Sequence, residues 1–453
     1  MEREHQNVTE LRTTKISTLL GKYYWPAFTG AIIHTLYNIV DRIFIGQGVG
    51  AEALAGLTSV FPIMLILMAF GMLVGMGSGV RISLNLGKKN VKRAEHVLGN
   101  ALMLCLTFAV VLSIGAFAVK TPLLQLFGVS SNTMGYANDY LDIILLGSVF
   151  NMTGFALNNI IRSEGNARIA MFSMIISAGL NLILDPIFIF VLDMGVQGAA
   201  LATVISQFFL FVWVIYHFLN KHSVIKLRWP NFKPNIEIIV YIITIGFAPF
   251  AMQLAASVVQ GTSNAQLVRY GGDLAVGSMG VIMSVSMLFL MAVFALNMAS
   301  QPIVSFNYGA EDYKRVKQTL MLTLKLSTII AICGGIFVEL FPSTIARMFN
   351  HDNLEFIELT KRGLRLVMIM YPIVGFQIVV SNYFQAVGNA WKSALLSLLR
   401  QVISLIPLLI LLPRFWGLDG VWLAFPFADT ISAIASAIFL TYEIKRLNSY
   451  IAA

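Results

Sequence analysis

Apolar runs long enough to cross a bilayer recur along this 453-residue chain and constrain its fold more than any other feature. A helix spans the hydrocarbon core with about 20 apolar residues, and within lipid only a helix or a closed barrel satisfies the backbone polar groups. Only 12% of the residues are charged. We therefore predict an all-α integral membrane protein with twelve transmembrane helices, at about 16–45, 55–80, 95–119, 139–161, 168–192, 198–220, 236–268, 275–300, 318–340, 364–386, 393–412 and 420–444.

The second half of the chain repeats motifs of the first half in the same order. The segment LNLGKKNVKRAEHVL (84–98) returns as FNYGAEDYKRVKQTL (306–320), and Pro26 returns as Pro249, at offsets of 222 and 223 residues. One copy therefore holds six spans, and because six is even both copies enter the membrane in the same direction. This predicts two six-helix bundles related by a pseudo-two-fold axis along the membrane normal. The first bundle is an N-terminal lobe at 1–220 and the second is a C-terminal lobe at 236–453, with a loop at 221–235 between them.

Lys and Arg are distributed unevenly between the predicted loops. With a cytoplasmic N-terminus, 21 of them fall on the cytoplasmic side and seven on the other. The positive-inside rule therefore predicts a multi-pass protein with both termini in the cytoplasm. The net charge of +9 then needs no nucleic-acid partner. The polar start predicts no cleaved signal peptide, and Cys105 and Cys333, both in predicted spans, indicate neither a disulfide nor a zinc site.

Acidic residues interrupt two apolar spans of the N-terminal lobe. In the first span, His34, Asn38 and Asp41 stand on one helical face, and in the fifth span Asn181 and Asp185 stand four residues apart on one face. A carboxylate at membrane depth is costly because burial disfavours its charged form. Intramembrane acids therefore usually mark the path of an ion or a substrate, although a helix-packing role is the alternative.

Two prolines and two further polar residues surround these acids in the sequence. Pro26 and Pro186 each remove a backbone hydrogen bond and predict hinges in their helices. Thr203 and Asn158 add oxygen atoms, so the set suits Na+, while a carboxyl pair equally suits a shared proton. We predict an ion site for H+ or Na+ and no organic cofactor. His34 and Asn38 are candidates to modulate proton or substrate binding. For His34, Asn158, Asn181 and Thr203, hydrogen bonding between helices is the alternative to a functional role.

Methionines in the second span and in its repeat partner recur at intervals of four residues. Met64 and Met68 belong to the first set, and Met283 and Met287 to the second. Flexible thioethers suit a cavity that accepts varied apolar molecules, and ordinary packing is the alternative. For the same cavity we predict polar contributions from Gln253 and Asn264.

The C-terminal lobe carries a different charge pattern. The position equivalent to Asp41 lies near Asn264, and that of Asp185 lies near Leu408, so we assign ion coupling to the first lobe. Arg400 and Asp429 are buried charges without another evident partner. We predict that they form a structural ion pair, with contact to substrate as the alternative.

Several motifs resemble the multidrug and toxin extrusion (MATE) family over nearly the whole chain. They are YNIVDRIFIGQGVGAEALAG, LNLGKKN, IIRSEGNA and GLNLILDPIFIF followed by GVQGAALAT. The missing acids in spans 7 and 10 are similar to the DinF-like branch and its MepA-like bacterial members. The resemblance implies ion binding by Asp41, Asn181 and Asp185, with Thr203 beside them, and a less secure match at Asn158.

The resemblance implies a function as well as a fold. We expect an antiporter of a bacterial cytoplasmic membrane that exports organic, often cationic, drugs or toxins in exchange for H+ or Na+. Its partners would be small amphipathic molecules and membrane lipids, and it would act as a monomer. A flippase for lipid-linked oligosaccharides is the alternative within the same superfamily. We find no HExxH or GxSxG motif, so an enzyme is not expected.

Overall fold

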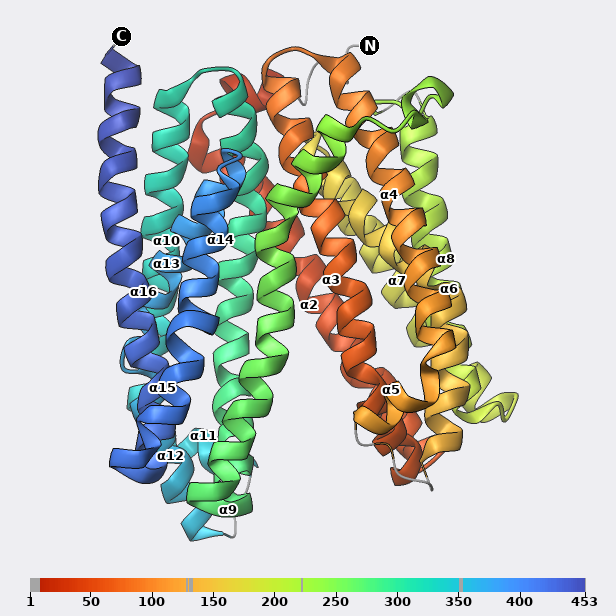
Figure 1. The fold of residues 1–453 in the computed structure, drawn as a ribbon, viewed down its shortest axis with the longest axis vertical. Helices are drawn as coiled ribbons and strands as arrows, with labels where there is room; N and C mark the ends of the chain where they lie inside the picture. Colours follow the sequence, from red (N-terminus) through yellow and green to blue (C-terminus); the bar gives the residue numbers. More distant parts are fainter. Residues whose placement is uncertain (1–8, 128, 130–132, 221–222, 350–352, 453) are drawn as a thin grey trace. The chain divides into compact units, whose positions relative to one another are not determined.

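The computed structural model describes residues 9–127, 129, 133–220, 223–349 and 353–452. Helices make up nearly all of this part of the chain, and no strand occurs in it. The chain divides into two compact units, residues 1–250 and 251–453, which are described separately. Figure 1 shows the helices in chain order from red to blue.

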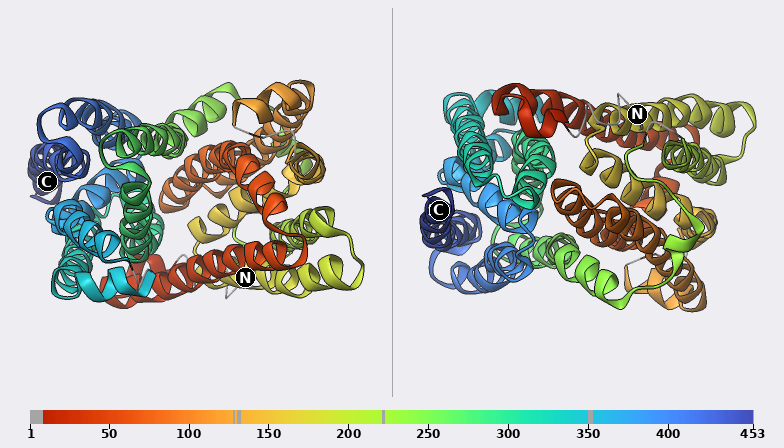
Figure 2. Two further views of the ribbon diagram at one scale, coloured as in Figure 1. Left: turned by 90° about the horizontal axis from the view of Figure 1, so that it is seen from below. Right: turned by 90° about the horizontal axis from the view of Figure 1, so that it is seen from above.

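The first unit contains the helices of the first repeat and the start of the next one. In order they are α2 (Ile16–Gly48), α3 (Ala51–Gly87), α4 (Val91–Ala118), α5 (Lys120–Leu126), α6 (Met134–Ser163), α7 (Ala167–Pro186) with the π-helical turn η1 (Ile187–Val191), α8 (Gly195–Leu219), the 3-10 turn η2 (Trp229–Phe232) and the beginning of α9 (Ile236–Gly309). Within this unit α2 packs on α7, α7 on α8, and α6 on α3, α4 and α8. Most of these helices run roughly side by side when viewed along the bundle (Figure 2).

The second unit contains the remainder of α9 and the helices that follow it. They are α10 (Tyr313–Leu340), α11 (Pro342–Phe349), α12 (Leu354–Met368), α13 (Tyr371–Ala386), α14 (Ala390–Leu398), the π-helical segment η3 (Leu399–Leu405), α15 (Ile406–Leu411) and α16 (Pro413–Ala452). Gly272 breaks α9 into two spans, since its φ of +66° is a left-handed conformation that glycine adopts without steric cost.

The helices account for every predicted span. Ten helices in the described residues are long and apolar enough to cross a membrane, and the bent pair α12–α13, with an angle of 46°, makes an eleventh. The remaining predicted span, 16–45, is α2. The all-α membrane prediction is therefore confirmed. The short helices α5 and α11 were not predicted, because one or two turns leave too weak a periodic pattern.

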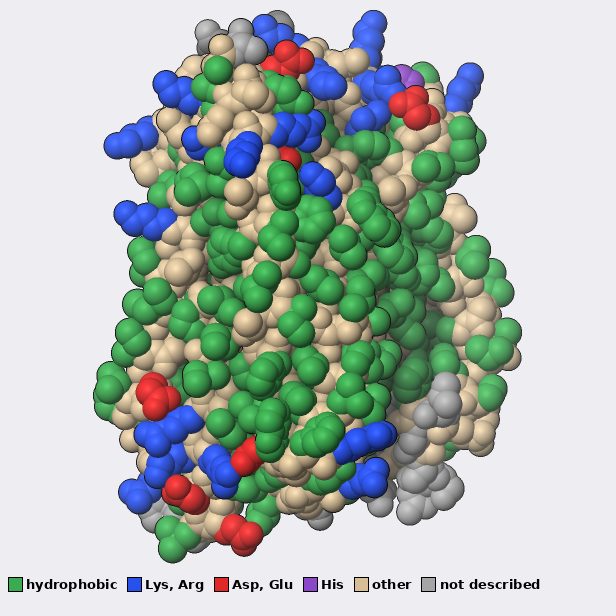
Figure 3. Space-filling model, turned by 60° about the vertical axis from the view of Figure 1, so that its left-hand side comes forward, with side chains coloured by type: hydrophobic (Ala, Val, Ile, Leu, Met, Phe, Trp, Pro, Cys, Tyr) green, Lys and Arg blue, Asp and Glu red, His purple; other side chains and the backbone are tan. Residues whose placement is uncertain are grey.

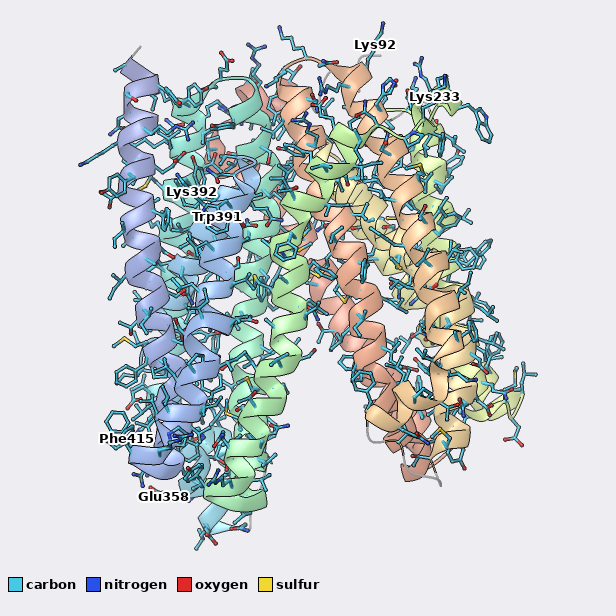
Figure 4. All side chains as sticks on the ribbon, in the orientation of Figure 1. Lys92, Lys233, Glu358, Trp391, Lys392 and Phe415 are labelled. Carbon is cyan, nitrogen blue, oxygen red and sulfur yellow. The ribbon has the colours of Figure 1, made fainter. Side chains whose placement is uncertain are left out.

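Side-chain chemistry follows the expected pattern of a membrane protein. On the face drawn in Figure 3, apolar side chains cover the central zone, and charged side chains gather at its two ends. In the first unit, Lys92 and Lys233 project at the end where α4 and α9 begin (Figure 4). In the second unit, Glu358 and Phe415 lie at the end away from Trp391 and Lys392. Which end faces the cytoplasm stays a prediction.

The loop between the predicted lobes packs tightly on the first unit. Asn100 of α4 donates to the carbonyl oxygen of Lys233 at 3.2 Å and accepts from the backbone N–H of Asn235 at 2.9 Å. Beyond the loop, the first turns of α9 meet α3 at backbone contact. A Cβ atom on Gly246 would lie 1.8 Å from the carbonyl oxygen of Leu73. The division between units therefore falls inside α9, and the predicted lobe limits stay a prediction.

Candidate functional site

Two buried acids from different helices meet inside the first unit. Asp41 of α2 and Asp185 of α7 are 9% and 1% exposed. Their carboxyl groups face each other at hydrogen-bond range. Asp185 lies at the end of α7, where Pro186 cannot continue the regular hydrogen-bond pattern and the chain passes into the π-helical turn η1.

An amide and a hydroxyl group complete the cluster. Asn181 Nδ2 donates to Asp185 Oδ1 at 3.2 Å and to Thr203 Oγ1 of α8 at 3.4 Å. Asn181 stands one turn before Asp185, so both project from the same face of α7. The structure thus brings Asp41, Asn181, Asp185 and Thr203 together from three helices, and we call these four residues the acid cluster.

The acid cluster contains buried oxygen atoms without a hydrogen-bond donor among the described residues. Asn181 Oδ1 and Asp185 Oδ2 are among these atoms. Because a carboxylate only accepts hydrogen bonds, a bond between Asp41 and Asp185 requires a proton on one of them. A buried oxygen without a donor is costly, so the cluster favours a bound proton or a hard cation. Ligands for Na+ would be the oxygens of these same four residues.

The side chain of Asn158 contacts residues outside the acid cluster. Its Nδ2 donates to Ser173 Oγ at 2.7 Å and to the carbonyl oxygen of Ala170 at 2.8 Å, and its Oδ1 accepts from Arg162 Nη2 at 3.0 Å. None of the described hydrogen bonds joins Asn158 to the acid cluster. Its predicted role as an ion ligand therefore has no direct geometric support.

Of the other residues predicted near this site, the structure describes the side chain of Pro26 only. The side chains of His34 and Asn38 lie outside the described residues. Pro26 is buried inside α2, where its missing N–H interrupts the helical hydrogen bonds. Its predicted role as a hinge stays a prediction.

The residues predicted to line a substrate cavity have mixed surroundings. Met64 packs against the apolar core of the first unit, and Met283 against that of the second. Met68 is partly buried, whereas Met287 is 58% exposed. In the second unit Gln253 is partly buried, and Asn264 Oδ1 accepts from Gln260 Nε2 at 3.1 Å. These positions do not by themselves define a cavity.

Arg400 and Asp429 form the predicted ion pair inside the second unit. Arg400 Nε lies 2.6 Å from Asp429 Oδ1, which also accepts from Gln377 Nε2 at 3.2 Å. Asp429 is buried, and Arg400 keeps 24% of its side chain exposed. The pair links η3 to α16, and this position suits a structural role.

Asp429→Asn is expected to destabilise the detergent-solubilised protein by about 1–3 kcal/mol, because it leaves the half-buried Arg400 charge without its acid. Arg400→Met in the same chain is expected to recover part of this loss. A thermal unfolding assay of the two single variants and the double variant measures the coupling. Strictly additive effects would contradict a structural ion pair.

The small polar residues that precede the acid cluster on α7 were not among the predicted site residues. Ser173 and Ser177 precede Asn181 and Asp185 at intervals of four residues, and this spacing was available in the sequence. The predicted fourth span ends at residue 161, which leaves Arg162 in a loop, whereas the structure places Arg162 in α6 with only 5% of it exposed. No local signal distinguishes it from a loop residue, since it stands one position before the helix ends.

The fold and the cluster define a multi-pass helical membrane protein with an acid pair buried in its first unit. The MatE family model matches the chain twice, at residues 26–187 and 249–410. The chain therefore belongs to the MatE family, and the predicted internal repeat is confirmed by the two matches.

Proteins and structures similar to this chain agree with that membership. The multidrug export protein MepA of Staphylococcus haemolyticus (strain JCSC1435) is 27% identical over 93% of this chain and 92% of that protein. MepA of Staphylococcus aureus (strain MRSA252) is 25% identical over the same shares. A crystal structure of a MATE transporter in the bent conformation has a TM-score of 0.92 at 25% identity and covers 99% of both chains. A MOP superfamily transporter from Pyrococcus furiosus has a TM-score of 0.90 at 25% identity and covers 98% of both chains.

Proposed function

We propose that this protein is a secondary active antiporter that exports organic, often cationic, drugs or toxins in exchange for H+ or Na+. The observation that carries the proposal is the buried Asp41–Asp185 pair with Asn181 and Thr203 beside it. Two carboxyls at hydrogen-bond range cannot both stay charged in an apolar bundle without a counter-charge. They therefore change charge when an ion binds, and this is what an exchange cycle requires.

The carboxyl pair favours H+ as the coupling ion. A single proton satisfies both carboxyls at once, since one O–H then donates to the other carboxyl. Na+ is the second candidate because Asn181 Oδ1 also lacks a donor and can serve as a ligand.

Export of drugs is supported by the relatives of this chain. The similar staphylococcal proteins are named multidrug export proteins. In the proposed cycle, the ion enters the acid cluster from outside and neutralises it, and α2 then bends near Pro26 to release the drug. Structures similar to this chain are described as bent and straight conformations of a MATE transporter, which supports such a step. We place the protein in a bacterial cytoplasmic membrane, with both termini inside, as a monomer.

Proteoliposomes with separately imposed ion gradients test the proposal. With ethidium as the organic cation, an acidic lumen is expected to drive dye accumulation, whereas a Na+ gradient at constant pH is expected to give none. Dye accumulation driven by Na+ alone would reassign the coupling ion. No accumulation under either gradient, with well-folded protein, would contradict drug antiport. Movement of a lipid-linked oligosaccharide between leaflets without a gradient would instead support the flippase alternative.

A further inference from the structure

The loop between α8 and α9 is fixed to the first unit along its inner side. Ile225 is fully buried. The backbone N–H of Lys226 donates to Glu95 Oε1 of α4 at 3.2 Å. A Cβ atom on Gly99 of α4 would lie 2.2 Å from the carbonyl oxygen of Asn231, so the loop backbone and α4 are in direct contact there. The loop therefore holds its outward-facing side chains in a defined place.

The outer side of the same loop carries large apolar side chains next to basic ones. Trp229 is 87% exposed, and Ile236 at the start of α9 is 75% exposed. The ring of Trp229 lies 5.8 Å from that of Phe232, which supports the indole from one side. Arg228 and Lys233 are exposed beside them. We call Arg228, Trp229, Lys233 and Ile236 the loop surface. Exposed apolar side chains in a rigid loop contribute little to folding and mark a surface for interaction.

Contacts with α4 place the loop surface at the depth of a membrane–water boundary. The helix α4 has 28 residues and is about 12 Å longer than a hydrocarbon core of about 30 Å, so it extends beyond that core. The loop contacts α4 at Glu95 and Asn100, whereas the apolar span predicted from the sequence begins at residue 95. Lys92 and Lys233 project at this end of the unit (Figure 4). Side chains exposed at this depth meet lipid headgroups.

The loop surface keeps a positive charge. Residues 223–235 include three basic residues and no acidic one. The basic residues are Lys226, Arg228 and Lys233. Two acids lie beside the loop. Glu95 is buried and lies 3.5 Å from Arg228 Nε, and Glu237 is already paired with Arg81 and Arg93. The remaining charge is complementary to an anionic leaflet, to which basic residues near a membrane are attracted.

We propose that the loop surface is a docking site for anionic phospholipids of the leaflet on this side of the membrane, which the distribution of Lys and Arg assigns to the cytoplasm. Arg228 and Lys233 pair with the lipid phosphate and its net negative headgroup. The indole of Trp229 lies at the headgroup boundary, where its apolar ring and its N–H group are both accommodated, and Ile236 contacts the acyl chains. This inference goes beyond antiport and depends neither on the acid cluster nor on the coupling ion.

Quenching of Trp229 fluorescence by brominated lipids is the direct test. The full chain is reconstituted in vesicles of phosphatidylcholine and phosphatidylglycerol at equal mole fractions, with bromine on the acyl chains of one lipid or the other. Trp229→Phe replaces an exposed ring, so the difference between wild type and this variant isolates the signal of Trp229. The expected association constant is about fivefold higher for phosphatidylglycerol than for phosphatidylcholine, which is the effect of about one basic residue near an anionic surface.

Charge-removing variants show whether the loop surface causes this preference. Lys233→Gln combined with Arg228→Gln is expected to bring the two association constants to about the same value. Lys233→Gln alone leaves Glu95 paired with Arg228 and is expected to lower their ratio about twofold. The matched control is Lys361→Gln combined with Arg365→Gln, which removes two basic residues from α12 of the second unit and is expected to keep the wild-type ratio.

Four results would overturn the proposal. The first is equal quenching of wild-type Trp229 by both lipids. The second is quenching by neither lipid, which would place the ring in water or against protein. The third is a wild-type ratio retained in both loop variants. The fourth is a preference that disappears when inorganic phosphate is added at constant ionic strength, since the basic residues would then bind a free anion. None of these measurements uses drug or an ion gradient, so failure of drug antiport is distinguishable from failure of the docking site.

Discussion

Asp41→Asn is expected to reduce ion-driven ethidium transport to the level of protein-free liposomes while the protein still folds and inserts. Asparagine matches the size of aspartate and can still hydrogen-bond to Asp185, so packing around α2 is preserved. It cannot take up a proton or change its charge, however. A ligand shifts a conformational equilibrium only through different affinity for the two states, and the variant removes that difference for the ion.

A second acid in the same unit provides the matched control for this prediction. Asp142 of α6 pairs with Lys120 at 2.7 Å and is 41% exposed, outside the acid cluster. Asp142→Asn removes one carboxylate in the same way and is expected to transport at the wild-type rate. Undiminished ion-driven transport by Asp41→Asn, measured beside this control at equal protein density, would refute the coupling role of the acid pair.

Gly246→Ala is expected to destabilise the protein by about 2 kcal/mol or more, the largest effect expected from adding one methyl group. The added Cβ would stand 1.8 Å from the carbonyl oxygen of Leu73, which is a backbone atom and cannot rotate away. The facing position in α3 is equally tight, with a Cβ on Gly77 lying 2.1 Å from the carbonyl oxygen of Ile242. Both helices must therefore separate, and overpacking of this kind costs about 1–3 kcal/mol or more.

Gly261→Ala, in the same helix, is expected to have the opposite effect on stability. No atom lies within 4 Å of a Cβ built there, so Gly261→Ala gains the helix propensity of alanine, about 0.5–1 kcal/mol, without a clash. Thermal unfolding in detergent is expected to show a lower melting temperature for Gly246→Ala and an equal or higher one for Gly261→Ala. Equal shifts in both variants would show that the α3–α9 contact relaxes freely.

The acid cluster illustrates how far residue spacing predicts a site. The four-residue interval between Asn181 and Asp185 places both on one face of α7 whatever surrounds that helix. Spacing cannot show which face of α2 meets α7, because an apolar helix has little amphipathic signal to orient it. The expectation that Asp41 meets Asp185 therefore rested on the shared chemistry of the two acids and on the resemblance to a family, and not on their spacing. The position of Asn158 beside Ser173 and Arg162 was not anticipated, since several orientations of α6 are equally apolar.

The sequence by itself determined the spans, the repeat and the identity of the buried acids, because hydropathy over about 20 residues dictates which segments enter a bilayer. Tertiary structure alone decided what those spans bring together. It packs the start of α9 on α3 through Gly77 and Gly246, and it buries Arg162 in the last turn of α6. Such contacts depend on small residues and on helix rotation, and lipid-facing and buried helix faces are both apolar, so their pattern along the chain does not reveal them.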